Sequence, residues 1–265
     1  MQNLLYLPVP MSFFVASAIT TFVALAGLYL VRKRYPAEVL KENHEVAAII
    51  FNAFGLFYGV MVAFVVFVTW SGYSDATKSL QMEANDADDI FHSTEAFPEP
   101  ARSVIKTELM NYVNSVYNDE LKKMDGGQVT LHARGPLHRL MDVFYHMDPQ
   151  AFSDRELYAE TLKRLNKLAE DRRLRIFAAN DTVPEAIWLV LLVGGLFTVL
   201  YTFFFGMKNI RAQYVITTTL TVTITLILFL IYVLDHPFTG ASKVSSEPLK
   251  EVIAVMQNES TPASP

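Results

Sequence analysis

Four apolar runs that contain no Asp, Glu, Lys or Arg constrain this sequence more than any other feature. They cover about residues 11–31, 46–70, 186–206 and 214–234. A helix rises about 1.5 Å per residue, so each run is long enough to cross a hydrocarbon core of about 30 Å. A helix also satisfies its backbone hydrogen bonds internally, which lipid requires. The sequence therefore predicts an integral membrane protein with four transmembrane helices.

The composition agrees with a membrane protein and excludes several other classes. Hydrophobic residues make up 52% of the chain and charged residues 18%, whereas soluble domains carry about 25% charged residues. The first run lacks a positive N-terminal flank and is followed by Arg32, Lys33 and Arg34, so it is predicted to be a membrane anchor and not a cleaved signal peptide. Without cysteine the chain has neither a disulfide framework nor a thiolate metal site. The net charge of −5 argues against a nucleic-acid partner.

The four runs divide the chain into domains. Residues 1–70 are predicted to form a first membrane half and residues 185–235 a second, with an extramembrane domain over residues 71–184 between them. The tail, residues 236–265, is predicted to begin as an amphipathic helix and to end in a disordered tract of mainly Ser, Thr, Pro and Ala.

Helical periodicity runs through the whole extramembrane domain. Apolar side chains recur at three- and four-residue spacing beyond the second span, so this helix is predicted to continue as far as Pro98. Further helices are expected over residues 104–125 and 136–145, and residues 153–156 form a capping box that opens a last helix. No alternating strand pattern occurs. The predicted fold class is all-α, with a helical domain inserted between spans two and three.

Positive charge is concentrated in the two short loops, and this bias predicts the orientation in the membrane. Cytoplasmic loops carry an excess of Lys and Arg, and short loops weigh most in this rule. The short loops are therefore expected in the cytoplasm and the large domain outside it, although Arg172, Arg173 and Arg175 before the third span oppose this. The cations of the short loops are Arg32, Lys33, Arg34, Lys41, Lys208 and Arg211.

Three stretches, in order along the chain, match one known pattern. They are residues 55–70 of the second span with His44 before them, residues 172–195 at the start of the third span, and residues 234–240 after the fourth. Together they resemble the bacterial bestrophin-like family, which is distantly similar to bestrophin ion channels. The matching positions include Gly55, Tyr58, Gly59 and Trp70, then Arg172, Pro184, Trp188 and Gly194, and finally Asp235, His236, Pro237, Phe238 and Gly240.

The resemblance implies a fold, partners and a location. Bestrophins are pentameric ion channels whose second span lines the pore, so the resemblance implies a homo-oligomer, with membrane lipids and permeant inorganic ions as the other partners. It also implies a multi-pass protein of the bacterial inner membrane. In bestrophins the large domain is cytosolic, which conflicts with the orientation expected from charge, and both orientations stay open.

Small and aromatic side chains of the second span are the candidates for a pore. Small residues at three- and four-residue intervals let another helix approach closely, which would make this face a packing groove. Alternatively, the face forms a narrow pore seam that aromatic rings close as a hydrophobic constriction. The candidates for lining or gating are Asn52, Phe54, Gly55, Tyr58, Gly59, Ala63 and Phe64.

Carboxylates just beyond the second span are candidates for an ion vestibule. They would concentrate cations, or several would bind Ca²⁺ through oxygen ligands, although their spacing is not that of an EF-hand. A solvated helix face is the alternative interpretation. The histidines lack a zinc-binding spacing, so no zinc is expected, and Ca²⁺ is the one cofactor that stays open. The vestibule candidates are Glu83, Asp86, Asp88 and Asp89.

The fourth span carries a polar face and a polar end. Thr217, Thr221 and Thr225 share one face and are expected to bond to neighbouring helices, with a hydrated lining as the alternative. The motif after the span is expected to cap and anchor its end, and the alternative is a carboxylate–imidazole pair that titrates near neutral pH. The residues of this motif are Asp235, His236, Pro237 and Phe238.

The chemistry of the spans narrows the function to two classes. They contain no Asp, Glu, Lys, Arg or His, which argues against pumps and coupled transporters. No phosphate loop, nucleophile elbow or dinucleotide fingerprint occurs, so no enzymatic activity is expected. We therefore predict an oligomeric ion channel. The alternative is a non-conducting membrane sensor or scaffold whose helical domain binds a partner.

Overall fold

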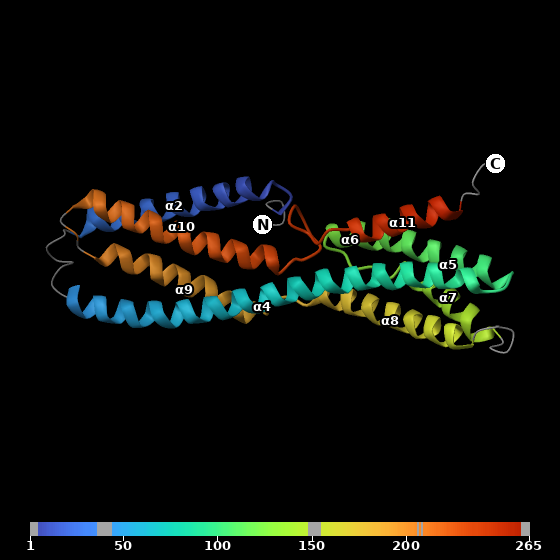
Figure 1. Ribbon diagram of the computed structural model, residues 1–265. Coiled ribbons are helices and arrows are strands. Elements are labelled where there is room, and N and C mark those ends of the chain that lie inside the picture. Colours follow the sequence, from blue (N-terminus) through green and yellow to red (C-terminus); the bar gives the residue numbers. More distant parts are fainter. Residues whose placement is uncertain (1–4, 36–43, 148–154, 206, 208, 261–265) are drawn as a thin grey trace. The chain divides into compact units, whose positions relative to one another are not determined.

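A computed structural model describes residues 5–35, 44–147, 155–205, 207 and 209–260 of the chain. Every regular element within these residues is a helix, so the predicted all-α class is confirmed. The chain folds as two compact units (Figure 1). Residues Met1–Ser71 and Thr182–Asp235 form the first, which we call the membrane unit. Residues Gly72–Asp181 and His236–Pro265 form the second, which we call the helical unit.

Four helices are long and apolar enough to cross a membrane, as the sequence predicts. The second of them continues well beyond a membrane span, because it contains 50 residues whereas a span needs about 20. This helix therefore contributes to both units, and its predicted continuation is confirmed. The four helices are α2 (Val9–Arg34), α4 (His44–Ser93), α9 (Glu185–Phe204) and α10 (Ile210–Leu234).

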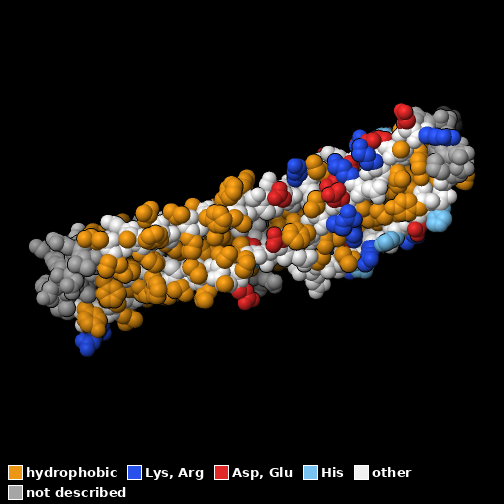
Figure 2. Space-filling model, turned by 90° about the horizontal axis from the view of Figure 1, so that it is seen from below, with side chains coloured by type: hydrophobic (Ala, Val, Ile, Leu, Met, Phe, Trp, Pro, Cys, Tyr) orange, Lys and Arg blue, Asp and Glu red, His pale blue; other side chains and the backbone are white. Residues whose placement is uncertain are grey.

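The surface of the membrane unit is strongly apolar. On the face that Figure 2 shows, hydrophobic side chains cover this unit, whereas Lys, Arg, Asp and Glu side chains gather on the helical unit. Phe22 of α2 and Phe57 of α4 are 75% and 74% exposed. An apolar surface of this extent requires lipid or a protein partner around it.

Hydroxyl groups join the helices inside the membrane unit. Thr20 of α2 and Thr225 of α10 share a hydrogen bond of 2.8 Å, and Thr202 of α9 and Thr217 of α10 share one of 3.0 Å. The packing role expected for Thr217 and Thr225 is therefore confirmed. Thr221 is buried between them, and its hydroxyl finds no hydrogen-bond partner among the described residues.

The helical unit consists of the second part of α4 and a set of shorter helices. Gly127, with φ of 74°, lies after α6 and adopts the left-handed conformation that ends a helix, at the stop that the sequence predicts. Of the predicted capping box, Ser153 and Asp154 lie outside the described residues. The helices are η1 (Thr94–Ala96), α5 (Ala101–Ser115), the π-helical turn η2 (Val116–Glu120), α6 (Leu121–Asp125), α7 (Arg134–His146), α8 (Arg155–Asn180) and α11 (Glu247–Ser260).

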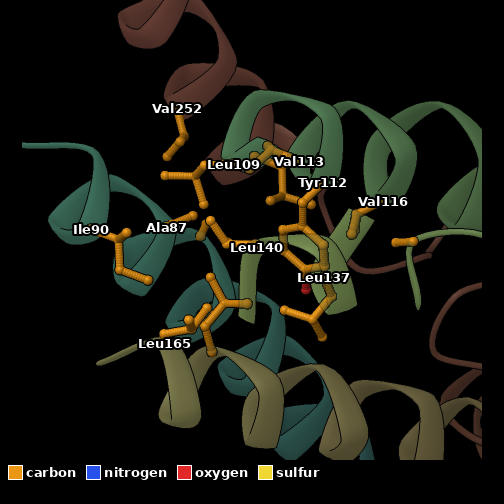
Figure 3. Close-up of a cluster of buried hydrophobic side chains, with 14 of the residues drawn as sticks. Ala87, Ile90, Leu109, Tyr112, Val113, Val116, Leu137, Leu140, Leu165 and Val252 are labelled. Atoms are coloured by element: carbon orange, nitrogen blue, oxygen red, sulfur yellow. The ribbon is translucent and has the colours of Figure 1, made fainter. Parts of the chain in front are cut away.

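The core of the helical unit draws side chains from most of these helices. Figure 3 shows Ile90 of α4, Leu109 of α5, Leu140 of α7 and Leu165 of α8 directed toward one another. Helix α11 adds Val252 to the same core, together with the buried Leu249 and Met256. The sequence predicts an amphipathic helix here, and the structure groups it with the helical unit instead of leaving it in a separate tail.

Candidate functional site

The membrane part of α4 turns its small residues away from the rest of the chain. Asn52, Gly59 and Ala63 are exposed, and a Cβ atom added at Gly55 or Gly59 would meet no other atom within 4 Å. No described helix of this chain occupies the small-residue stripe. The packing-groove interpretation thus finds no partner helix among the described residues and stays a prediction, and the stripe is open to another copy, to lipid or to water.

A second face of α4 is fixed to α9 by Tyr58. The hydroxyl group of Tyr58 donates a hydrogen bond of 3.0 Å to the carbonyl oxygen of Leu191. Its ring lies on Gly194, where an added Cβ atom would come within 2.5 Å of the ring. Phe54 packs beside this contact, with its ring centroid 6.3 Å from that of Tyr58 and 6.2 Å from that of Tyr201. Two of the aromatic pore candidates therefore hold α4 on α9.

A third face of α4 carries the remaining aromatic candidate. The side chain of Phe64 is 66% exposed. At about 100° per residue, Phe64 lies about 120° around the helix from Asn52, and Tyr58 lies about 120° from Asn52 in the other direction. The membrane part of α4 thus has three faces: the contact of Tyr58 with α9, the small-residue stripe, and a face with Phe64.

Asp235 anchors the end of α10 within the membrane unit. One carboxylate oxygen accepts a hydrogen bond of 2.7 Å from the backbone N–H of Val183, just before α9. The other accepts one of 3.4 Å from the indole N–H of Trp188. Trp188 also packs edge-to-face on Tyr232 of α10, with ring centroids 6.1 Å apart. The carboxylate therefore joins the end of α10 to the start of α9.

The rest of the span-end motif belongs to the helical unit. Phe238 is buried in its core. Beyond it, Gly240 adopts a φ of 80° and donates its backbone N–H to Asp125 at 3.1 Å. The backbone N–H of Val244 donates to the carbonyl oxygen of Pro237 at 2.7 Å and closes the loop. The four-residue motif is thus divided between two folding units, and each half has its own packing role.

The acidic run beyond the second span contains a fully buried ion pair. Glu83 has no exposed surface and accepts from the Nε of Arg175 at 2.5 Å and from the hydroxyl of Tyr112 at 2.5 Å. Burial and the charge of Glu83 raise the pKa of Tyr112 well above its usual value, so the phenol stays protonated and donates. Glu83 follows Leu80 by three residues on the apolar face of α4, so its burial could have been read from the sequence. The solvated-face interpretation is wrong for Glu83.

A second carboxylate completes this buried cluster. Glu120 accepts from the Nη2 of Arg175 at 2.8 Å, from the Nη2 of Arg172 at 2.6 Å and from the backbone N–H of Ala133 at 3.0 Å. Glu120 ends the π-helical turn η2, which makes a local change in helix register. Burial acts to lower the pKa of Arg175, but the charges of Glu83 and Glu120 outweigh it and raise this pKa. Sequence reasoning did not identify Glu120 as part of this cluster.

The other candidates of the acidic run lie in two different environments. Asp86 is buried, so the solvated-face interpretation is wrong for it also, and its carboxylate lies 3.7 Å from the guanidinium of Arg164 of α8. Asp88 and Asp89 are partly exposed: Asp88 lies 3.5 Å from His92, and Asp89 is paired with Arg164. In the described part of the chain, no three His, Asp or Glu side chains converge as metal ligands. This geometry gives no support to a calcium site there.

A comparison with models of known protein families shows to which family this chain is related. A model of the bestrophin-like domain matches residues 18–249. The chain belongs to the bestrophin-like family. This bestrophin-like chain has no match among curated proteins. Family membership supports an ion-channel kind of function and confirms the resemblance seen in the sequence.

Solved structures of a bacterial bestrophin homologue from Klebsiella pneumoniae share the fold of this bestrophin-like chain. A variant of that homologue aligns with a TM-score of 0.74 and 13% identity over 93% of this chain and 98% of its own. Another variant gives 0.69 and 13% over 96% and 97%. A structure phased on zinc gives 0.66 and 12% over 92% and 96%. At these identities the likeness shows the fold alone, so the roles of individual side chains must come from this chain.

Proposed function

We propose that the chain is a subunit of an oligomeric ion channel in which copies of the membrane unit surround an axis and α4 lines the pore. Family membership supports the channel, and the arrangement of α4 carries the proposal. One face is held on α9 by Tyr58, while the faces with Gly59 and Phe64 are open. A pore helix needs such a fixed face. Without it, the helix could turn about its own axis, and no particular side chains would face the ions.

The three faces of α4 match the three neighbours of a helix in a ring. One face packs on its own chain, one approaches the next copy, and one faces the axis. Gly59 and Ala63 suit the approach between copies, because small side chains let two backbones come close. Phe64 suits the axis, where a ring of apolar side chains gates by excluding water. By analogy with bestrophins, the ring contains five copies.

The charges of α4 fit a path that continues beyond the membrane. The span itself carries no Asp, Glu, Lys or Arg, so selectivity within it rests on neutral groups. Asp88 and Asp89 lie farther along the same helix, and their side chains are 37% and 48% exposed. Carboxylates beside a channel raise the local concentration of cations. These two residues are the vestibule candidates that we retain.

Flux through liposomes tests the proposal. The full-length protein would be purified in detergent, its copy number determined by light scattering, and the oligomer reconstituted into vesicles with fluorescent reporters for K⁺, Na⁺ and Cl⁻. We expect flux from the wild type. Phe64→Ala should raise it severalfold without changing the copy number, because the constriction widens. Gly59→Leu should lower both flux and copy number, because the copies no longer pack closely.

A matched control lies on another helix of the membrane unit. The side chain of Phe22 in α2 is 75% exposed, compared with 66% for Phe64 in α4. Because α2 does not line the proposed pore, Phe22→Ala should leave flux unchanged. Silent vesicles from a verified oligomer, with each of the three ions, would overturn the channel and favour the non-conducting scaffold. Equal flux changes in Phe22→Ala and Phe64→Ala would instead reject the role of Phe64.

Orientation in the bacterial inner membrane has its own test. The charge bias of the short loops places the helical unit outside the cytoplasm, and that is the orientation we propose. The chain has no cysteine, so Gly126→Cys, next to the left-handed Gly127, introduces a single thiol. A membrane-impermeant maleimide should label it in intact cells. Labelling only after lysis would place the unit in the cytosol, as in bestrophins.

A further inference from the structure

Positive charge gathers at one end of the membrane unit. Arg32, Lys33 and Arg34 occupy the last turn of α2, and Arg211 lies in the first turn of α10. Figure 1 shows these two turns at the same end of the membrane unit. All ion pairs that the described residues form lie in the helical unit, so none of the four cations has a described carboxylate partner. Over residues 32–45 and 207–211 the sequence has six cations and three carboxylates, which leaves an excess of positive charge.

Arg32 joins the end of α2 to the chain just before α10. Its Nη2 donates a hydrogen bond to the carbonyl oxygen of Met207. The side chain of Asn209 then begins α10, because it accepts hydrogen bonds from the backbone N–H groups of Arg211 at 3.0 Å and of Ala212 at 3.4 Å. These bonds keep Arg211 close to the last turn of α2.

One donor of Arg32 is not used by the described part of the chain. Its Nε is buried and has no hydrogen-bond partner among the described residues. A buried donor without an acceptor costs free energy, and the cost is largest for a charged group. A guanidinium presents its N–H groups as a planar fork that fits two oxygen atoms of a phosphate. Arg32 is therefore suited to a phosphate group that comes from outside the chain.

Two tyrosines indicate the depth of these cations in the bilayer. Tyr29 precedes them by one turn and is 56% exposed, and Tyr35 follows them and is 46% exposed. The guanidinium of Arg34 lies 5.6 Å from the centre of the Tyr35 ring. Exposed tyrosines at the end of a span lie at the level of the lipid head groups, where the phosphates are. The last turn of α2 is thus at the depth at which its cations can meet a lipid phosphate.

We propose that Arg32, Lys33, Arg34 and Arg211 form a binding site for the head group of an anionic phospholipid. Arg32 donates to the phosphate, the three exposed cations attract its negative charge, and the acyl chains lie on the apolar surface of the membrane unit. The partial negative charge at the end of a helix also favours cations in its last turn. That effect accounts neither for Arg211, at the start of a helix, nor for the unused donor of Arg32. The site requires neither the proposed channel nor either orientation, because both leaflets contain phosphates.

Native mass spectrometry of the full-length protein tests the binding. The protein in detergent would be mixed with phosphatidylglycerol or with phosphatidylethanolamine of the same acyl chains, so that only the head group differs. The wild type should retain the anionic lipid in preference to the zwitterionic one. A cation beside an anionic lipid strengthens binding about fivefold. The triple variant Lys33→Gln, Arg34→Gln and Arg211→Gln should therefore retain phosphatidylglycerol at least about tenfold less well and bind phosphatidylethanolamine as before.

A second variant tests Arg32 itself. Arg32→Lys keeps the positive charge and a donor for Met207 but lacks the planar fork, so it should lower retention of phosphatidylglycerol severalfold. Thermal unfolding without added lipid shows whether each variant is folded. The triple variant leaves the bond from Arg32 to Met207 in place, so it serves if Arg32→Lys is unstable.

A matched control removes equal charge from the helical unit. Lys163→Gln, Lys167→Gln and Lys250→Gln together change three exposed cations and should leave lipid retention at the wild-type level. Equal retention of phosphatidylglycerol by the wild type and the first triple variant would overturn the proposal, and so would an equal loss in the control. Inorganic phosphate at the lipid concentration should not raise the unfolding temperature. If it did so as strongly as phosphatidylglycerol, the site would bind a free anion and not a lipid. Vesicles that conduct no ions would reject the channel and leave this lipid site standing.

Discussion

The two units of this protein bury polar groups in opposite ways. Within the spans of the membrane unit, neutral hydroxyls such as those of Thr202 and Thr217 join the helices, and the carboxylate of Asp235 acts only at the end of α10. Inside the helical unit two arginines and two glutamates lie almost without exposed surface, and their charges balance. A unit surrounded by water can hold a charge cluster because apolar helices cover it. A unit surrounded by lipid is limited instead by how closely its helices fit.

The largest expected effect tests the charge cluster. Arg175→Met leaves Glu83 and Glu120 buried without their shared cation, and breaking a buried pair in this way costs about 3–5 kcal/mol. Thermal unfolding of the detergent-solubilised protein should show this loss. Arg173→Met, at an exposed position two residues away, is the control and should change stability by less than about 0.5 kcal/mol. Similar losses of stability in both variants would mean that the buried charges do not set the helical unit apart from the membrane unit.

A double variant sharpens the same comparison. Removing Glu83 as well, in Glu83→Gln with Arg175→Met, takes away one buried negative charge that the single variant leaves uncompensated. Part of the stability should return, because residues of one network do not act additively. No recovery would show that packing of the arginine, and not its charge, is what the core requires.

The next largest effect tests the fit of the membrane unit. Gly194→Ala places a methyl group where the ring of Tyr58 now lies, so the ring must move. Overpacking of this kind costs about 1–3 kcal/mol. Gly72→Ala is the control, because an added Cβ atom there meets nothing within 4 Å. Combining Gly194→Ala with Tyr58→Ala should recover stability, and a failure to do so would show that Gly194 contacts something other than Tyr58.

The smallest effect concerns an exposed ion pair of the helical unit. A hydrogen bond from Lys106 holds the pKa of Glu95 below its usual value, so this pair adds stability at neutral pH that is lost on acidification below about 4.5. Glu95→Gln should cost less than about 1 kcal/mol, because water and salt screen exposed pairs. Unfolding at low and high salt checks this. A loss as large as that of Arg175→Met would remove the distinction between buried and exposed charges.

The fold was more predictable than the site, and particular residues show why. Uncharged runs that are long enough to span lipid have few alternatives to a helix. The three- and four-residue spacing of apolar side chains after the second span predicted the continuation of α4. The aromatic residues Phe54, Tyr58 and Phe64 look alike in the sequence. Only the contact with Gly194, more than 130 residues away, shows that Tyr58 faces inward.

Pairing between distant charges was the other limit. Arg172 and Arg175 continue the apolar spacing of Leu165 and Leu168, so their burial was readable from the pattern of α8. Their partners were not, because Glu83 is 92 residues from Arg175 and Glu120 depends on the register change of η2.

Helix α11 has a consequence for how the protein is made. It supplies Leu249, Val252 and Met256 to a core whose other helices precede α9 in the chain. On the ribosome those helices emerge first, and two more segments must enter the bilayer before α11 is synthesised. Until α11 is made, the core of the nascent chain therefore has an uncovered apolar surface. Synthesis of α11, and not insertion of any one segment, is the event that closes it.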